Sequence, residues 1–228
     1  RNVSLWSSPQ LHIRDFFVKT DLDKEYKNAT LEVSAKIKNY NEIAGKKQTL
    51  TATLYDKSGA EVAKGNVTGK ALGAKQEEQL TVKFNVTNPN KWTAETPNLY
   101  TLVLSDTEGE LISSKVGFRK VEIKGRVMTV NGTPIKLKGV NRHEHWSDVG
   151  HAITEEQMIR DLQVIKQGNC NHVRTCHYSD DPRWYELCDE WGIWLVAEAN
   201  CECHGYDGRF DEEPLMKSAI IDRNVANV

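Results

Sequence analysis

The hydrophobic pattern of this chain changes character near residue 120, and that change restricts the fold more than any other feature. From residue 1 to about 119, apolar and polar residues alternate, as in Leu31–Ile37 and Leu80–Val86. A period of two is the spacing of a β-strand with one buried face. Beyond about residue 140, helical spacing alternates with short apolar runs. The sequence therefore predicts two domains, residues 1–119 and 120–228.

The first domain is predicted to be an immunoglobulin-like β-sandwich. Six or seven strand-like segments fit within about 110 residues, which is typical of such sandwiches. Turn sequences such as Asp56-Lys57-Ser58-Gly59 separate them. The stretch from Asn88 to Tyr100 contains two prolines, which a central strand does not tolerate. We expect it to form a long ordered connection that is held in place by Trp92.

Helix signals follow in the second domain. Thr154 and Gln157 have the spacing of a capping box, and apolar residues keep to one face until Gly168 ends the segment. A second helix is predicted to begin at Pro182 and to end at Gly192.

Strand signals lie between these helices. Asn131-Gly132 predicts a hairpin that links the domains. A short strand is expected at residues 171–175, Ile193–Ala197 is predicted to be a buried strand, and a further helix is expected after Pro214. Alternating strands and helices are typical of a parallel (β/α)8 TIM barrel, of which about three of eight units are present. The predicted fold class is multidomain: an immunoglobulin-like β-sandwich followed by the truncated start of a TIM barrel.

Polar side chains cluster at the ends of three predicted strands in succession. Barrel enzymes place their catalytic and binding groups at the carboxyl ends of strands. The sequence therefore predicts an active-site wall. Its members are Asn141, Arg142, His143, Glu144 and His145 after the first strand, Arg174, His177 and Tyr178 after the second, and Glu198, Asn200, Glu202 and His204 after the third.

Each of these residues also has a structural interpretation. A histidine can donate to a sugar hydroxyl, or its ring nitrogens can form hydrogen bonds to other protein groups within the wall. Arg142 and Arg174 can pair with carboxylates, Glu198 among them, because a buried Arg–Glu pair also shapes a site. Asn200 can orient a ligand or simply end the strand.

The segment Cys201-Glu202-Cys203-His204 contains residue types that bind metal ions. In an extended conformation the two cysteines point one way, and Glu202 and His204 point the other way. No single ion would then be held by all four. One carboxylate and one imidazole on a shared face suit a hard or borderline divalent ion that is completed by water, and the cysteines are expected to be packing groups.

Charge and composition argue against some partners. The formal net charge is −2, so no basic field favours nucleic acid or anionic lipid. No stretch has the roughly 18 apolar residues that a membrane span needs. All five cysteines lie after residue 169, and reduced thiols are expected. The first residues do not resemble a signal peptide, which favours a cytoplasmic over a periplasmic location.

Several of these motifs together resemble a known family. The runs Asn171–Tyr178 and Trp184–Ile193 resemble the signature of glycoside hydrolase family 2. Gly139–His145, Glu198–Asn200 and Glu202–Gly205 are similar to the long bacterial β-galactosidases of that family. The resemblance covers essentially the whole chain.

The resemblance implies roles for individual residues. The substrate, a β-galactoside sugar, would be contacted by His143, His177 and Asn200, and Mg²⁺ would be held by Glu202 and His204. Supporting roles would fall to Asn141, Arg142, Arg174 and Glu198.

The resemblance also implies that the chain is an internal fragment. Family members cleave with retention through two glutamates about 5 Å apart, and both would lie beyond Val228. We therefore expect the chain alone to be inactive. Three alternatives stay open: another family 2 specificity, a carbohydrate-binding module with Trp6 or Trp92 on an exposed face, and a complementing fragment. Trp6 and Trp92 are themselves expected in the core. The incomplete barrel would leave open strand edges, which predicts self-association.

Overall fold

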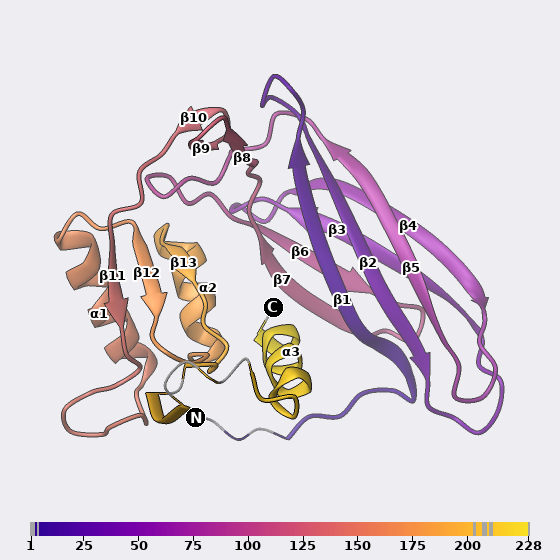
Figure 1. Ribbon diagram of the computed structural model, residues 1–228. Coiled ribbons are helices and arrows are strands. Elements are labelled where there is room, and N and C mark those ends of the chain that lie inside the picture. Colours follow the sequence, from indigo (N-terminus) through magenta and orange to yellow (C-terminus); the bar gives the residue numbers. More distant parts are fainter. Residues whose placement is uncertain (1–2, 4, 203, 207–208, 210–211, 228) are drawn as a thin grey trace. The chain divides into compact units, whose positions relative to one another are not determined.

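The computed structural model describes residues 3, 5–202, 204–206, 209 and 212–227. Its contacts divide the chain into two compact units, one of residues 2–135 and the other mainly of residues 136–228. Figure 1 shows the strands of the first unit in indigo to magenta and the strands and helices of the second in orange and yellow. None of the described helices is long and apolar enough to cross a bilayer.

The first unit contains two antiparallel sheets, which confirms the predicted sandwich. One sheet has the order β1-β2-β5 and consists of Leu11–Leu22, Ala29–Asn39 and Glu77–Val86. The other has the order β4-β3-β6-β7 and consists of Glu61–Ala71, Lys47–Tyr55, Tyr100–Ser105 and Leu111–Val116.

The sandwich core follows from the period of two. Along β2 every second residue is buried, because successive side chains point to opposite faces of a strand. The facing positions of β3 and β6 fill the other half of the core. The fully buried apolar residues of these three strands are Leu31, Val33, Ala35, Ile37, Leu50, Ala52, Leu54, Leu102 and Leu104.

The proline-containing connection is ordered, as predicted. Trp92 is 1% exposed, its amide donates to the carbonyl of Phe118, and an isolated bridge joins it to Pro97. The expectation that Trp6 is also in the core was wrong, because its side chain is 75% exposed. Trp6 lies in a segment without regular structure ahead of β1, so no strand pairing presses it onto the sheets.

A small three-stranded sheet is the last element of this unit. It consists of β8 (Val121–Lys124), β9 (Val127–Val130) and β10 (Thr133–Pro134). Asn131 and Gly132 both have positive φ, at 50° and 79°, as a two-residue hairpin turn with the twist of its strands requires. The hairpin predicted at Asn131-Gly132 is confirmed.

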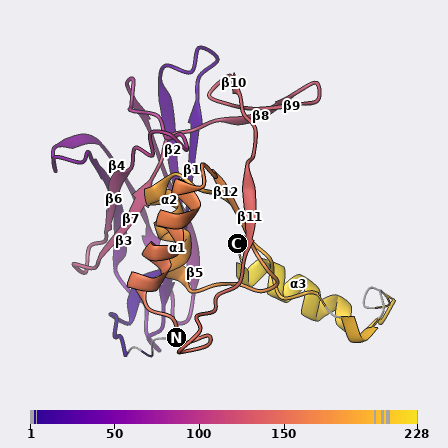
Figure 2. The same cartoon turned by 90° about the vertical axis from the view of Figure 1, so that its left-hand side faces the viewer.

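The second unit starts with the alternating parallel strands and helices of a TIM barrel. Its parallel sheet has the order β11-β12-β13, formed by Gly139–Arg142, His172–Thr175 and Trp194–Val196. The helices α1 (Glu155–Gln167) and α2 (Pro182–Trp191) connect these strands. Figure 2 shows both helices on the same side of the strands. The helices and the sheet share one hydrophobic core. It contains Met158, Leu162, Ile165, Val173, Trp184, Leu187 and Ile193.

The predicted helix ends are confirmed by their hydrogen bonds. The backbone amide of Gln157 donates to the Thr154 hydroxyl at 3.4 Å, and the Thr154 amide donates to Gln157 Oε1 at 2.8 Å. Asp181 caps α2 by accepting from the Arg183 amide at 2.9 Å, and Gly192 ends α2 in the left-handed conformation.

The side chains of the last strand and the last helix are more exposed to solvent than the sequence predicts. The strand predicted at Ile193–Ala197 is confirmed as β13, but the prediction that it is buried was wrong, because Val196 is 47% exposed. Among the described residues, α1 and α2 pack against the same face of this open sheet (Figure 2), and β13 pairs with β12 alone. The 3-10 turn η1 (His204–Tyr206) and α3 (Met216–Asn227) follow, and no side chain of α3 is classed as buried.

Candidate active site

The three parallel strands bring their carboxyl ends to one edge of the sheet. Arg142 pairs in register with Thr175, and Arg174 pairs with Val196. Parallel strands in register end together, so the segments that follow them meet at that edge. Five of the predicted wall residues lie in close contact there: His143, Arg174, His177, Tyr178 and Glu198.

Two histidines from neighbouring segments face one another at this edge. The rings of His143 and His177 are 5.6 Å apart between centres and nearly perpendicular. His143 is exposed and His177 is half-buried. Nδ1 of His143 also lies 3.4 Å from the hydroxyl of Tyr178. Both histidines are therefore accessible to a ligand from solvent.

Arg174 and Glu198 form an ion pair beside His177. Oε2 of Glu198 lies 3.3 Å from Nδ1 of His177, and Nη2 of Arg174 lies 3.3 Å from the same nitrogen. The pairing with Glu198 that we considered for Arg174 is thus observed. When Nδ1 carries a proton and donates it to Glu198, Nε2 is left with a free lone pair.

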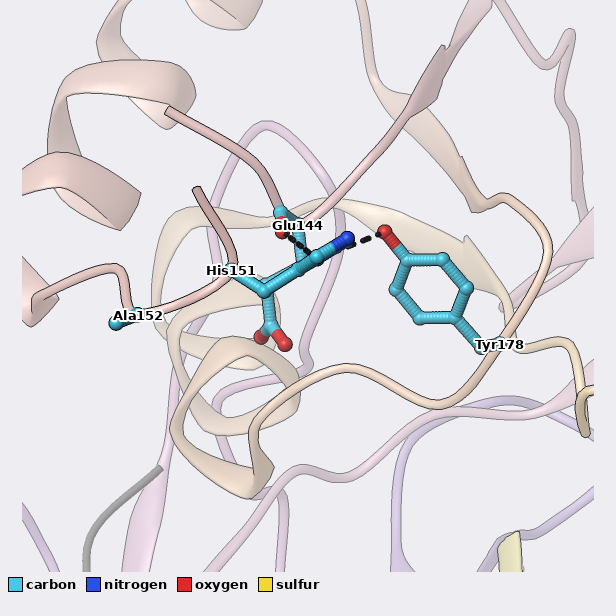
Figure 3. Close-up of a pocket in the computed structure, with 4 residues that line it drawn as sticks. All are labelled: Glu144, His151, Ala152 and Tyr178. Carbon is cyan, nitrogen blue, oxygen red and sulfur yellow. Dashed lines mark hydrogen bonds between the residues drawn. The ribbon is translucent and has the colours of Figure 1, made fainter. Parts of the chain in front are cut away.

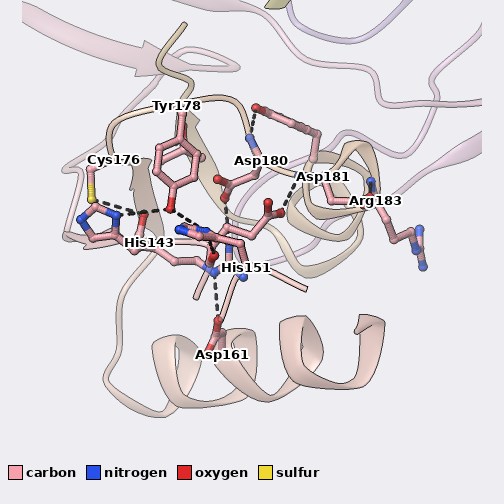
Figure 4. A network of polar contacts seen from close by, with 12 residues as sticks. His143, His151, Asp161, Cys176, Tyr178, Asp180, Asp181 and Arg183 are labelled. Atoms are coloured by element: carbon pink, nitrogen blue, oxygen red, sulfur yellow. Dashed lines mark hydrogen bonds and ion pairs between the residues drawn. The ribbon is translucent and has the colours of Figure 1, made fainter. Parts of the chain in front are cut away.

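Arg142 lies beneath the wall. Its Nε donates to Asp161 of α1 at 2.9 Å, and its Nη1 donates to Asp180 at 2.7 Å (Figure 4). The guanidinium carbon lies 3.7 Å from the ring centre of Trp184. The pairing with carboxylates considered for Arg142 is therefore observed, and this residue braces β11 against both helices.

A cavity of about 500 Å³ lies next to Tyr178, whose hydroxyl contacts His143. It is lined by Glu144, His151, Ala152 and Tyr178. Figure 3 shows the Tyr178 hydroxyl pointing at the His151 ring, whose Nδ1 is 3.4 Å away. The same nitrogen of His151 is 2.6 Å from the carbonyl oxygen of Glu144. Burial raises the pKa of Tyr178 above its ordinary value, so this phenol stays protonated at neutral pH.

His151 also lies at this edge and is not among the residues that the sequence predicts there. A bridge between Trp146 and Gly150 reverses the loop after β11 and returns His151 to Glu144. Gly150 has a φ of 60° at this turn, which suits a glycine. The Asp148-Val149-Gly150 sequence was the available turn signal, but it does not say which neighbour the loop returns to.

Of the other predicted residues, three lie beyond the third strand and Asn141 lies within the first. Oε1 of Glu202 is 2.9 Å from Nε2 of His204, and both side chains are open to solvent. Asn200 is exposed with a positive φ of 54°, and its carbonyl accepts from Nη1 of Arg223. Asn141 is exposed within β11.

The structure describes one of the two cysteines of the segment Cys201–His204. Cys201 is half-buried, and its Sγ donates to the carbonyl of Ala199 at 3.4 Å. Cys203 lies outside the described residues. All described cysteines are free thiols, as the sequence predicts.

A β-sandwich followed by strand–helix units with polar groups at the carboxyl ends of the strands defines a module of a barrel-type enzyme. Two family models match the chain. Residues 11–119 match the model described as glycosyl hydrolases family 2, and residues 121–226 match the TIM barrel domain of the same family. The chain belongs to glycosyl hydrolase family 2.

Named relatives carry two different activities. A β-galactosidase of Priestia megaterium (strain DSM 319 / IMG 1521) is 46% identical over 98% of this chain and 23% of its own length. A crystal structure of a β-glucuronidase of Parabacteroides merdae is 26% identical, with a TM-score of 0.72 over 82% of this chain and 23% of its own. A putative β-galactosidase of Bacteroides fragilis is 26% identical, with a TM-score of 0.72 over 80% of this chain and 28% of its own. The chain thus spans about a quarter of the length of these proteins.

Proposed function

We propose that this chain is part of a β-galactosidase that hydrolyses terminal, non-reducing β-D-galactosides. The observation that carries the proposal is the pair His143 and His177, whose rings lie 5.6 Å apart at the carboxyl ends of adjacent parallel strands. Imidazoles at such a place can bond to neighbouring hydroxyls of one sugar ring. The 46% identity to a β-galactosidase along nearly the whole chain favours galactose as that sugar.

In this proposal the Arg174–Glu198 pair is a positioning device. When Nδ1 of His177 carries a proton it donates to Glu198, which leaves Nε2 to interact with a hydroxyl. Arg174 neutralises Glu198, so the carboxylate orients the ring without an excess negative charge. Asn200, exposed at the same edge, would supply an amide to the sugar.

Magnesium would be held by Glu202 and His204. A carboxylate oxygen and an imidazole nitrogen converge there to 2.9 Å, and both side chains are open to solvent. The donor set fits Mg²⁺ because this ion keeps several waters and takes few protein ligands. A bound Mg²⁺ would stabilise negative charge near the reacting sugar. The contact between Glu202 and His204 orients the two ligand atoms toward one another at the edge of the site.

The described carboxylates closest to the two histidines have other partners. Glu198 is paired with Arg174, and Glu144 is buried and accepts from the amide of Asp181. Neither is offered to a glycosidic bond. A retaining mechanism needs two carboxyl groups about 5 Å apart. We infer that this chain alone does not turn over substrate, and that the complete enzyme uses a pair from outside it with retention.

The activity of the isolated chain can be measured with a chromogenic β-galactoside. We expect hydrolysis at the rate of a buffer control, before and after Mg²⁺ is added. Measurable turnover by the purified chain would contradict the inference that it lacks the catalytic pair.

The proposed specificity is tested on the longer protein that carries this chain. We expect it to cleave β-galactosides with a higher kcat/KM than β-glucuronides or β-mannosides. The structural similarity to a β-glucuronidase makes this comparison necessary, and a preference for glucuronides would overturn the galactose assignment.

A matched pair of variants tests the histidine that carries the proposal. His143→Gln should lower kcat/KM by about 10²-fold, the usual effect of losing one donor that acts in the transition state. His145→Gln changes an equally exposed histidine two residues further on, and we expect a much smaller loss. Equal losses would show that the effect is not specific to His143.

A further inference from the structure

Three metal-binding side chains converge at the strand ends. They are His143, Cys176 and His177, and one ligand atom of each lies within 4.8 Å of the others. Figure 4 shows the sulfur of Cys176 beside the ring of His143. Cys176 is buried, and its thiol lies 3.3 Å from the carbonyl oxygen of Arg142. This contact holds the sulfur in place below the two histidine rings.

We propose that His143, Cys176 and His177 bind a zinc-class divalent ion. Two imidazole nitrogens and a thiolate are the donors that Zn²⁺ prefers, and they are poor donors for Mg²⁺. This set is distinct from the Glu202 and His204 pair, which offers oxygen and one nitrogen. Three protein ligands with an open fourth position form the pattern of an accessible zinc site.

The distances allow an ion after a small closure. Zinc bonds of about 2.0–2.3 Å place tetrahedral ligand atoms roughly 3.3–3.8 Å apart, so no pair has to approach by more than about 1.5 Å. His143 is exposed and His177 is half-buried, and their rings can turn toward the fixed sulfur. No movement of the buried Cys176 is needed.

Groups around the three ligands are placed as in known zinc sites. Metal-bound histidines usually donate their other ring nitrogen to a carboxylate or another acceptor, which fixes the ring. Here Glu198 lies 3.3 Å from Nδ1 of His177, and the Tyr178 hydroxyl lies 3.4 Å from Nδ1 of His143. In both rings Nε2 is the nitrogen left for an ion.

The local charge also favours a cation. The two arginines nearest the cluster are both paired: Arg174 with Glu198, and Arg142 with Asp161 and Asp180. These five side chains together carry one net negative charge. The Cys176 thiolate formed on binding adds a second, because the ion displaces the thiol proton.

The ion would compete with the sugar, and this consequence alone rests on the proposed function. His143 and His177 cannot bond to galactose hydroxyls and to a metal through the same nitrogen. Zinc would then act as an inhibitor of the complete enzyme that is competitive with the galactoside.

Cobalt absorption provides a test on the complete 228-residue chain. Co²⁺ bound to a thiolate gives a charge-transfer band that oxygen and nitrogen ligands do not give. We expect one Co²⁺ per reduced, folded chain with this band, and its displacement by Zn²⁺. The Cys176→Ser variant should lose the band and bind Zn²⁺ at least tenfold more weakly.

Two further variants keep the result interpretable. The double variant Cys201→Ser/Cys203→Ser removes the other thiols near a histidine and should keep the band. His143→Gln changes an exposed side chain, so it should fold normally and still bind Zn²⁺ more weakly. Circular dichroism confirms the fold of each. A band that persists in Cys176→Ser, or its absence from the unmodified chain, would overturn the proposed site.

The outcomes separate the site from the enzyme function. Thiolate-dependent Co²⁺ binding by a chain whose longer form cleaves no galactoside would reject only the proposed function. Galactoside cleavage by a protein without thiolate-dependent Co²⁺ binding would reject only the metal site.

Discussion

Nη1 of Arg142 lies 2.7 Å from Oδ2 of Asp180, and both side chains are buried. Arg142 belongs to β11, whereas Asp180 directly precedes the cap of α2. The same guanidinium donates to Asp161 of α1 and stacks over Trp184 of α2. One side chain therefore joins the first strand to both helices. It also fixes the backbone immediately before His143.

Removing Asp180 should be costly. The variant Asp180→Ala leaves a buried guanidinium with one carboxylate fewer, and breaking such a pair costs about 3–5 kcal/mol of unfolding free energy. Urea denaturation followed by tryptophan fluorescence would measure the loss. Glu186→Gln is the matched control, because Glu186 pairs with Arg183 on the surface, where a pair contributes about 1 kcal/mol or less. Equal losses in the two variants would contradict this account.

Much of the fold could be predicted from local signals. The alternation in Ala29–Asn39 shows a strand with one buried face, and the structure buries that face completely. The Thr154 and Gln157 pair marks a helix start because both groups satisfy amides of the same turn. Asn131-Gly132 predicts its hairpin because both positions require positive φ. Each of these signals involves residues that are close in the sequence.

Features that depend on distant partners could not be predicted in the same way. Strand β4 alternates weakly and contains two glycines, so its membership in the sheet depends on pairing with β3. The sequence suggested carboxylate partners for Arg142 but could not select Asp161 and Asp180. His151 reaches the site through a loop whose end point no periodicity specifies. The exposure of Val196 and Trp6 depends on which neighbours cover them.

The cysteines should differ in reactivity. Cys176 and Cys188 are buried, whereas Cys170 and Cys201 are half-buried. Burial also raises the pKa of the Cys188 thiol well above its ordinary value, and only the thiolate is nucleophilic. Iodoacetamide should therefore label Cys170 and Cys201 before Cys176 and Cys188 in the folded chain, as peptide mass spectrometry would show.

Unfolding provides the control for this pattern. In urea all five cysteines should be alkylated at similar rates. Labelling of Cys188 in the folded chain as fast as that of Cys170 would show that α2 opens far more often than its packing suggests.

Acid should weaken the second unit through His172. Burial lowers the pKa of this histidine, and its Nε2 is buried without a hydrogen-bond partner among the described residues. The unfolded ring has an ordinary pKa of about 6.5, so below that pH the unfolded chain takes up the proton first. Stability is then present above pH 6.5 and falls as the pH drops toward the pKa of the folded state.

The contribution of His172 can be isolated by difference. His172→Gln should lose less unfolding free energy between pH 7 and about pH 5.5 than the unmodified chain, because its side chain does not titrate. His204→Gln is the matched control, since that side chain is 98% exposed, and it should keep the full pH dependence. An unchanged pH dependence in His172→Gln would refute the assignment.

The chain should self-associate through the open side of its second unit. Ile221 and Val225 of α3 are 54% and 73% exposed, and residues four apart share one face of a helix. Val140 of β11 and Val196 of β13 are also exposed, and within the described chain each of these strands pairs only with β12. Apolar faces and unpaired strand edges of this kind associate.

Light scattering after gel filtration measures this association. The mean mass should rise above 25.9 kDa as the concentration increases. The double variant Ile221→Lys/Val225→Lys places two charges on the exposed face of α3 and should shift the chain toward the monomer. Lys217→Glu/Arg223→Glu changes the charge of the same helix while keeping its apolar residues, so it should still associate. A constant monomer mass at high concentration would show that the open sheet and α3 are stable in water without a partner.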